Sequence, residues 1–175
     1  MDSDEKAIQE GRKLHGKKNS FDDNLCSLLV LLFGCPQPAA ASDAIPIVPY
    51  TLQEKEMLGY IVQQEAGGYD LEHKQAIVQV ILNRVRSEAF PDTIYGVLTQ
   101  ANQFSSLSNW YSRRNPPDSV TLKAVETVLK GEYIDMTKGA TFFYAPRWAG
   151  SASNWFETSL QYLFTLDGHR FFKAA

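Results

Sequence analysis

Both cysteines of this chain, Cys26 and Cys35, lie in its first quarter. The rest of the chain therefore has no disulfide and no thiolate metal site, so any fold that it adopts must be held by side-chain packing alone. The chain has 175 residues, of which 44% are hydrophobic and 12% aromatic. This length and composition predict one globular domain with a proper core, and leave too few residues for a second.

The first fifty residues differ in kind from the rest. Basic residues precede an apolar run, Leu25 to Phe33, which ends at Gly34-Cys35-Pro36 and is followed by small residues. This order is typical of a secretory signal, and the run is shorter than the roughly 20 apolar residues that a membrane-spanning helix needs. We therefore predict an export signal and linker over residues 1–50 and a folded domain over residues 51–175.

The signal leaves two alternatives open. Acidic residues at the extreme N-terminus and at Asp22-Asp23 also fit a disordered tail with an apolar patch. The string Leu32-Phe33-Gly34-Cys35 loosely resembles a lipoprotein cleavage box, which makes Cys35 a candidate for lipid attachment and membrane anchoring. The expected location is outside the cytoplasm, in the cell envelope, with or without a lipid anchor.

Hydrophobic periodicity predicts helices in the first two thirds of the domain. Thr51 and Glu54 have the spacing of a capping box, and apolar residues follow at helical spacing up to Gly67-Gly68. Further predicted elements are a helix over 71–85, a short element over 93–98 and a helix from a cap at Ser119 to Gly131.

The remaining segments predict a loop, a strand and a hairpin. Residues 102–117 are polar, aromatic and end in proline, so we expect a long surface loop there. Residues 141–144 have the composition of a strand. Two further apolar runs, 162–166 and 169–172, flank Asp167-Gly168, which predicts a β-hairpin with a tight turn.

Glu65 is the most informative residue of the domain. It lies four residues after Ile61 and three after Val62, on the apolar stripe of the first predicted helix. Burial there would raise the pKa of the carboxyl group and keep it protonated near neutral pH, as a general acid requires. The alternative is a structural ion pair with Arg84 or Arg86 on the second helix.

Several strings around Glu65 resemble, in order and approximate spacing, the SleB/CwlJ-type cell-wall hydrolases, which are known chiefly as spore-cortex-lytic enzymes. Many strings in one order are far more specific than a single motif. The matching strings, which cover roughly Leu52 to the C-terminus, are Gln64-Glu65-Ala66-Gly67-Gly68, Gln75-Ala76-Ile77-Val78-Gln79-Val80-Ile81-Leu82-Asn83-Arg84-Val85, Phe90-Pro91-Asp92-Thr93-Ile94-Tyr95-Gly96-Val97, Gln103-Phe104-Ser105, Ala140-Thr141-Phe142-Phe143-Tyr144 and Gly168-His169-Arg170-Phe171-Phe172.

The resemblance implies an α+β, lysozyme-like fold that is mainly α-helical, with a small antiparallel sheet or hairpin near the C-terminus. It implies that Glu65 is the catalytic acid and that the substrate is the MurNAc–GlcNAc backbone of peptidoglycan, in the vegetative wall or the spore cortex. The family commonly has a second acid directly after the glycine, where this chain has Tyr69 followed by Asp70. Whether Asp70 takes over that role stays open.

The number of carboxyl groups bears on the mechanism. A hydrolysing glycosidase needs a second carboxyl group about 5 to 9.5 Å from the first, and the matched strings supply no obvious one. A lone glutamate favours a lytic transglycosylase, which leaves a 1,6-anhydro-MurNAc end, as the resemblance also implies. Two alternatives remain: a non-catalytic peptidoglycan-binding module on the same fold, and a protein-interaction domain with an incidental tail.

Eight further side chains are candidates for lining a glycan groove. Amides and hydroxyls can bond sugar hydroxyl and acetamido groups, and aromatic rings can stack on sugar faces. For the aromatic residues, ordinary core packing is an equal alternative, and for the histidine a bond to the backbone. The candidates are Gln103, Ser105, Asn154, Phe104, Tyr144, Trp148, Trp155 and His169.

Several functions are disfavoured. A net charge of −3 and a pI near 5.6 give no basic face for nucleic acid. His73 and His169 are the only histidines of the domain and no H-E-x-x-H string exists, so we expect neither zinc nor another cofactor. Ser105-Ser106 with His169 lacks a nucleophile elbow. Without a recognisable binding repeat, targeting is expected to depend on a separate regulatory or targeting protein.

Overall fold

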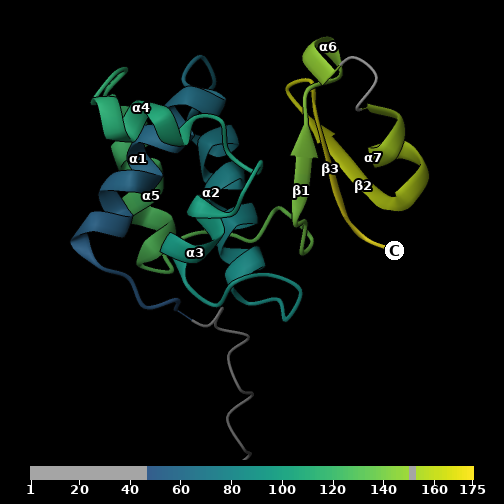
Figure 1. Ribbon diagram of the computed structural model, residues 1–175, viewed down its shortest axis with the longest axis horizontal. Helices are drawn as coiled ribbons and strands as arrows, with labels where there is room; N and C mark the ends of the chain where they lie inside the picture. Colours follow the sequence, from purple (N-terminus) through teal and green to yellow (C-terminus); the bar gives the residue numbers. More distant parts are fainter. Residues whose placement is uncertain (1–46, 150–152) are drawn as a thin grey trace, which may run out of the picture. The chain divides into compact units, whose positions relative to one another are not determined.

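The computed structural model describes residues 47–149 and 153–175. The predicted export signal, the Cys35 attachment site and the first part of the linker lie outside these residues. In chain order the elements are α1 (Leu52–Ala66), α2 (Leu71–Val85), α3 (Ile94–Thr99), α4 (Leu107–Ser112), α5 (Ser119–Leu129), β1 (Phe142–Tyr144), α6 (Pro146–Ala149), α7 (Ser153–Ser159), β2 (Leu160–Leu166) and β3 (His169–Ala174) (Figure 1). The predicted α+β class is confirmed.

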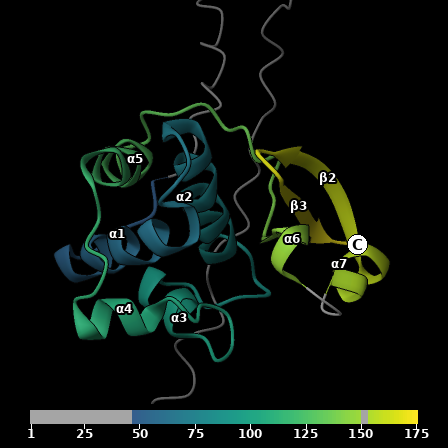
Figure 2. The same ribbon diagram turned by 90° about the horizontal axis from the view of Figure 1, so that it is seen from above.

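Helix α2 is the centre of the helical part and packs against α1, α3 and α5 (Figures 1 and 2). The predicted capping box begins α1: Thr51 Oγ1 accepts a hydrogen bond from Glu54 N at 3.2 Å, and the Glu54 carboxylate accepts one from Thr51 N at 2.8 Å. Apolar side chains at helical spacing, among them Leu58, Ile61 and Ile77, are completely buried. The apolar period, together with the capping box of α1, therefore placed α1 and α2 correctly.

The cap of α5 differs from the prediction. Asp118, not Ser119, is the N-cap, and its Oδ1 accepts a hydrogen bond from Thr121 N at 2.7 Å. The same carboxylate also accepts two bonds from Lys74 Nζ, at 3.0 and 3.1 Å. Because the side chain of Lys74 is only 1% exposed, a carboxylate suits this cap better than a hydroxyl.

The expected long loop over residues 102–117 is wrong in its middle, where α4 forms. None of the six residues of α4 is fully buried, and only Leu107 and Trp110 pack against the core, which is too short an apolar pattern to predict a helix from the sequence. It lies on α1, and a contact between Trp110 Nε1 and Glu56 Oε2 at 3.4 Å joins the two. Helix α7 was also not predicted, and it too contains no buried residue.

The C-terminal segments form a three-stranded antiparallel sheet in the order β1-β3-β2. The hairpin turn is confirmed, and both strands are longer than the predicted runs. Asp167 has φ 46° and Gly168 has φ 87°, the left-handed conformations that a tight hairpin turn of this twist requires. Across the sheet Tyr144 lies opposite Arg170, and Phe142 opposite Phe172.

Polar contacts join this sheet to α2. Asn83 Nδ2 donates to Ala140 O at 3.0 Å, and Arg84 Nε donates to Thr141 O at 2.6 Å, just before β1. Phe171 of β3 is completely buried and belongs to the same hydrophobic cluster as the helices. The C-terminal end of α2 is thereby held against the segment that leads into β1. In the described part of the chain, no helix has both the length and the apolar character to cross a membrane.

Candidate active site

Glu65 lies in the last turn of α1, directly before the buried Ala66 and the cap residue Gly67. A Cβ atom at Gly67 would come within 2.4 Å of Gln63 O, so only glycine fits the backbone there. At Gly68 a Cβ would meet nothing within 4 Å, which leaves the approach to the helix end open. The Glu65 side chain is itself partly buried and is a wall of two neighbouring pockets.

Burial is the largest influence on the Glu65 carboxyl and raises its pKa above the usual 4.5. The nearby Ser106 hydroxyl lowers this pKa. Its oxygen does not form a hydrogen bond of normal length and angle with any described residue, so the contact is weak. The positive charge of Arg84 also lowers this pKa. Burial prevails, so the carboxyl holds its proton to a higher pH than an exposed glutamate.

The structure does not support the alternative prediction of an ion pair between Glu65 and Arg84. Among the ion pairs of the described residues, none joins Glu65 and Arg84 within 4.0 Å. The guanidinium acts on the carboxyl through space only. Glu65 is thus available to a ligand and is not locked in a closed pair with this arginine.

Two pockets meet at Glu65 and share Phe143. The first, which we call the histidine pocket, has a volume of about 410 Å³, and the second, the arginine pocket, about 230 Å³. The histidine pocket is lined by Gln64, Glu65, Tyr69, Phe143, Tyr144, Ala145 and His169. The arginine pocket is lined by Glu65, Arg84, Asn102, Gln103, Phe104, Phe142, Phe143, Trp155 and Phe156.

Most of the predicted groove residues come together here. Tyr144 and His169 line the histidine pocket, and Gln103, Phe104 and Trp155 line the arginine pocket. Two candidates line neither pocket and are exposed, namely Ser105 and Asn154. The side chain of Trp148 lies outside the described part of the chain.

The Tyr144 hydroxyl is held in place by a hydrogen bond to the carboxylate of Glu157. It donates a hydrogen bond to Glu157 Oε1, and the other carboxylate oxygen, Oε2, accepts a bond from Arg170 Nη2 at 3.0 Å. Burial raises the pKa of Tyr144, and the negative charge of Glu157 adds to this effect. Glu157 could not be predicted from the sequence, because α7 was not predicted, although Arg170 lies opposite Tyr144 across the sheet.

His169 lines the histidine pocket and contacts a second histidine, His73, which is not part of the pocket wall. The ring centroids of His73 and His169 lie 4.7 Å apart, and Tyr69 stacks on His73 at 4.1 Å. Burial lowers the pKa of His73, and burial together with the charge of His73 lowers the pKa of His169 to about 4. Asp167 Oδ2 lies 3.3 Å from His73 Nδ1. Tyr69 is thus part of an aromatic cluster.

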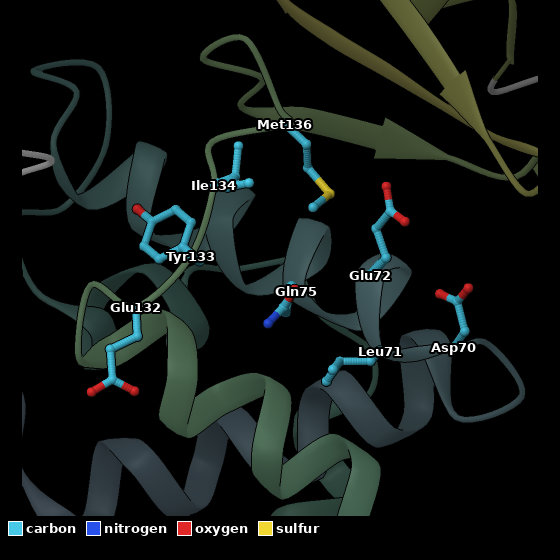
Figure 3. Close-up of a pocket in the computed structure, with 8 residues that line it drawn as sticks. All are labelled: Asp70, Leu71, Glu72, Gln75, Glu132, Tyr133, Ile134 and Met136. Atoms are coloured by element: carbon cyan, nitrogen blue, oxygen red, sulfur yellow. The ribbon is translucent and has the colours of Figure 1, made fainter. Parts of the chain in front are cut away.

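A larger pocket, of about 640 Å³, lies away from Glu65 and is shown in Figure 3. It is formed by the start of α2 and the segment after α5, and Asp70, Glu72 and Glu132 supply its carboxylates. These three residues are exposed, and Figure 3 shows Glu132 at the opposite end from Asp70 and Glu72. Asp70 caps α2, since its Oδ1 accepts from His73 N at 2.9 Å. This pocket lacks a buried acid.

Metal ligands do not gather at any of these pockets. Within residues 47–149 and 153–175, no group of three or more histidine, cysteine, aspartate or glutamate side chains is placed to hold a metal ion.

Comparison with known proteins gives the same family from sequence and from structure. The Cell Wall Hydrolase family matches residues 68–172, a stretch that begins three residues after Glu65. A spore cortex-lytic enzyme of Halalkalibacterium halodurans is 30% identical over 106 residues, which are 61% of this chain and 31% of that protein. A spore cortex-lytic enzyme of Oceanobacillus iheyensis is 31% identical over 107 residues, 61% of this chain and 37% of that protein. The match thus spans only about a third of these relatives.

Two solved structures resemble the fold. The catalytic domain of the germination-specific lytic transglycosylase SleB from Bacillus anthracis superposes with a TM-score of 0.61 at 27% identity, and covers 74% of this chain and 100% of that domain. The catalytic domain of the Bacillus cereus SleB protein gives a TM-score of 0.60 at 25% identity, over 77% of this chain and 99% of that domain.

Proposed function

The chain belongs to the Cell Wall Hydrolase family, and from this premise we propose that its domain cleaves the MurNAc–GlcNAc backbone of peptidoglycan as a lytic transglycosylase, with Glu65 as the catalytic acid. The observation that carries the proposal is the position of Glu65. Its carboxyl group is partly buried, has a raised pKa and lies where two pockets with aromatic and amide walls meet. The names of the relatives and structural neighbours support the substrate class.

In the first step, protonated Glu65 donates its proton to the glycosidic oxygen as the bond from that oxygen to the muramyl C1 breaks. The leaving GlcNAc gains a 4-hydroxyl, and positive charge develops at C1. In the second step the muramyl 6-hydroxyl attacks C1, and the Glu65 carboxylate takes up the hydroxyl proton. This closes the 1,6-anhydro ring, regenerates the acid and consumes no water. Between the steps, the positive charge of Arg84 stabilises the carboxylate.

Hydrolysis would need a second carboxylate to activate water or to attack C1. Among the described residues that line the two pockets, Glu65 is the one carboxylic acid. Glu157 lies behind Tyr144 with both oxygens engaged by Tyr144 and Arg170. Asp70 and Glu72 line the separate pocket of Figure 3. This distribution of acids favours the transglycosylase reaction.

The other walls supply the groups that hold a glycan. Tyr144 and His169 lie on one side of Glu65, and Gln103, Phe104 and Trp155 on the other. Trp155 is 50% exposed, so its ring can stack on a sugar face, while Phe104 is 7% exposed and shapes the floor of its pocket. Ser105 and Asn154 line neither pocket, so we assign them no contact with the glycan there.

The site of action follows from the relatives and from the N-terminal sequence. We place it outside the cytoplasm, at the spore cortex or the vegetative wall, with residues 1–50 as the export signal and linker. Attachment of lipid at Cys35 and control by a separate targeting protein remain part of this proposal. Mass spectrometry of the mature N-terminus from the native host tests both the cleavage and the lipid.

The reaction is tested by incubating the purified chain with vegetative peptidoglycan and with spore cortex, and by mass spectrometry of the soluble muropeptides. We expect fragments that lack one water at the muramyl end. Ordinary reducing ends would instead establish hydrolysis. Retained binding without any release from either substrate would establish a non-catalytic module. Glu65→Gln is the inactive reference, and Glu72→Gln is its matched control on the neighbouring helix.

A further inference from the structure

Arg84 is a cation enclosed by the protein. It is 5% exposed, and its Nε donates to Thr141 O at 2.6 Å. The guanidinium carbon lies 5.2 Å from the ring centroid of Phe90, 5.3 Å from that of Phe104 and 5.5 Å from that of Phe142. Burial lowers the pKa of Arg84 only to about 10, so the group stays charged at neutral pH.

This buried charge lacks an anionic partner within the described residues. None of the described ion pairs includes Arg84, and its Nη1 atom has no hydrogen-bond partner. The three rings attract the cation but do not neutralise it. Buried guanidinium groups are normally paired with a carboxylate, because an unpaired charge in a protein interior is unfavourable.

Glu65 does not supply the missing anion while it acts as an acid. Glu65 is the nearby acid whose charge raises the pKa of Arg84, and only the ionised form of Glu65 attracts the guanidinium. In the form that donates a proton, the carboxyl group is neutral. The catalytically competent state of the site therefore contains one buried, unneutralised guanidinium that faces a pocket.

We propose that Arg84 binds a carboxylate carried by the substrate in the arginine pocket. A guanidinium presents two parallel N–H donors that match the two oxygens of a carboxylate. The pocket holds about 230 Å³ and is walled by aromatic rings, with the exposed amide of Gln103 at its edge. Such a lining suits a sugar that bears one acidic substituent.

This inference rests on the proposed function and adds to it the direction in which the glycan chain binds across the two pockets. In peptidoglycan a muramyl sugar carries a free carboxylate either on its lactyl group, where no peptide stem is attached, or on its stem, whereas GlcNAc carries none. A carboxylate at Arg84 therefore places the muramyl sugar, and not the GlcNAc, in the arginine pocket. The bound carboxylate also replaces Glu65 as the counter-ion of Arg84, so that Glu65 keeps its proton to a higher pH once the substrate is bound.

The test measures binding by calorimetry to the full chain that carries Glu65→Gln, so that no ligand is cleaved. Four ligands are compared: GlcNAc-MurNAc with its free lactyl carboxylate, the same disaccharide with L-alanine, its neutral L-alaninamide, and the neutral GlcNAc disaccharide. We expect one of the two carboxylate ligands to bind at least about tenfold more tightly than the amide, and the tighter of the two identifies the source of the carboxylate. Equal affinity for the acid and the amide overturns the proposal.

Arg84→Met and Arg84→Lys, each combined with Glu65→Gln, separate recognition from support of the fold. We expect the methionine variant to bind acid and amide alike, and the lysine variant to keep part of the preference. Equal weakening of every ligand with the preference intact assigns Arg84 a structural role only. If Arg84→Met does not fold, the proposal is decided by the affinities for the acid and the amide that are measured on the chain with Arg84 present. Cleavage of peptidoglycan without any carboxylate preference overturns this inference and leaves the proposed function standing.

Discussion

In the core between α1, α2 and α5, most of the buried side chains are apolar, and Leu58, Ile61 and Ile77 have no exposed surface. We call the histidine and arginine pockets, with the residues around Glu65, the cleft. Its buried groups include Arg84, Ser106 and His169, each with a polar atom that has no hydrogen-bond partner among the described residues. One helix therefore serves both regions. The core supplies stability, and the cleft gives up stability to hold groups that a ligand can satisfy.

The two regions also treat buried charge differently. Lys74 and Arg84 lie on the same helix, and both are almost completely buried. Lys74 has its carboxylate, Asp118, at 3.0 Å, whereas Arg84 has none within the described residues. This contrast predicts that substitutions in the helical core change stability and spare the chemistry, while substitutions in the cleft do the reverse.

The largest effect is expected from Glu65→Gln. Loss of the general acid should lower the rate of muropeptide release by roughly 10³-fold or more. The fold should be as stable as before at neutral pH, or more so, because the folded-state pKa of Glu65 is raised. Its contribution to stability is complete below the ordinary value of 4.5 and is lost as the pH rises through the folded value.

The measurement is paired, with rates on peptidoglycan and thermal unfolding at neutral and acidic pH. Glu72→Gln, on an exposed carboxyl in the first turn of α2, is the control and should leave both unchanged. A Glu65→Gln protein that keeps its activity, or a Glu72→Gln protein that loses it, contradicts the division between core and cleft.

The next effect compares two leucines of α1. Leu58→Ala should lower the free energy of unfolding by about 2 to 5 kcal/mol, since it opens a cavity in the core, while Leu52→Ala should change it by less than about 0.5 kcal/mol. Leu58 is 0% exposed and Leu52 86%. Chemical denaturation measures both values. Per folded molecule, Leu58→Ala should cleave at the wild-type rate, and a large fall in that rate would show that core and cleft are not separable.

These two regions were also unequally predictable from the sequence. The helical type of α1 and α2 followed from the spacing of residues such as Ile61 and Ile77, because a buried stripe leaves a period of 3.6 in the sequence, and the capping box and Gly67-Gly68 gave the bounds of α1. Helices α4 and α7 have only six and seven residues and no fully buried one, so they are too short to show such a period. The hairpin was found because its turn needs the left-handed conformations that Asp167-Gly168 can adopt.

At the site, the sequence predicted Glu65 and several of its neighbours but not how they are held. The position of Glu65 on an apolar stripe was enough to predict its raised pKa. Arg84 was considered only as a partner for an ion pair, since sequence spacing does not reveal the three rings around it. Glu157 was missed because only the folded chain brings it to Tyr144.

A smaller effect is expected at Asp118. Asp118→Ala removes the cap of α5 and the partner of Lys74, and should lower the free energy of unfolding by about 2 kcal/mol, a value discounted because the carboxylate is partly exposed. Asp118→Asn keeps an acceptor for the cap and should lower it less. The hydrogen bond from Thr121 N, and then Lys74, lowers the pKa of Asp118 from 3.8 to about 2, so this stabilisation is lost as the pH falls through that range.

Urea denaturation of the two variants at neutral pH gives the comparison. Equal losses would mean that the charge on the carboxylate contributes nothing, and that the pairing of Lys74 does not distinguish the core from the cleft.

The smallest effect concerns the histidines of the cleft. Because burial and His73 lower the pKa of His169 from 6.5 to about 4, the unfolded chain takes up the proton first. Stability should therefore fall as the pH decreases from 6.5 towards 4, by roughly 1 to 2 kcal/mol at pH 5. His169→Gln should flatten this part of the stability curve. An unchanged slope in the variant would assign the pH dependence to other groups.

The central claim is that Glu65 is held in its acid form by its surroundings. A ¹³C NMR titration of the Glu65 carboxyl carbon in the folded chain tests this directly, with Glu65→Gln used to assign the resonance. We expect the midpoint of the titration to lie above 4.5, the value of an exposed glutamate. A midpoint at or below 4.5 would contradict it, because such a carboxyl would have given up its proton before it could act as the acid.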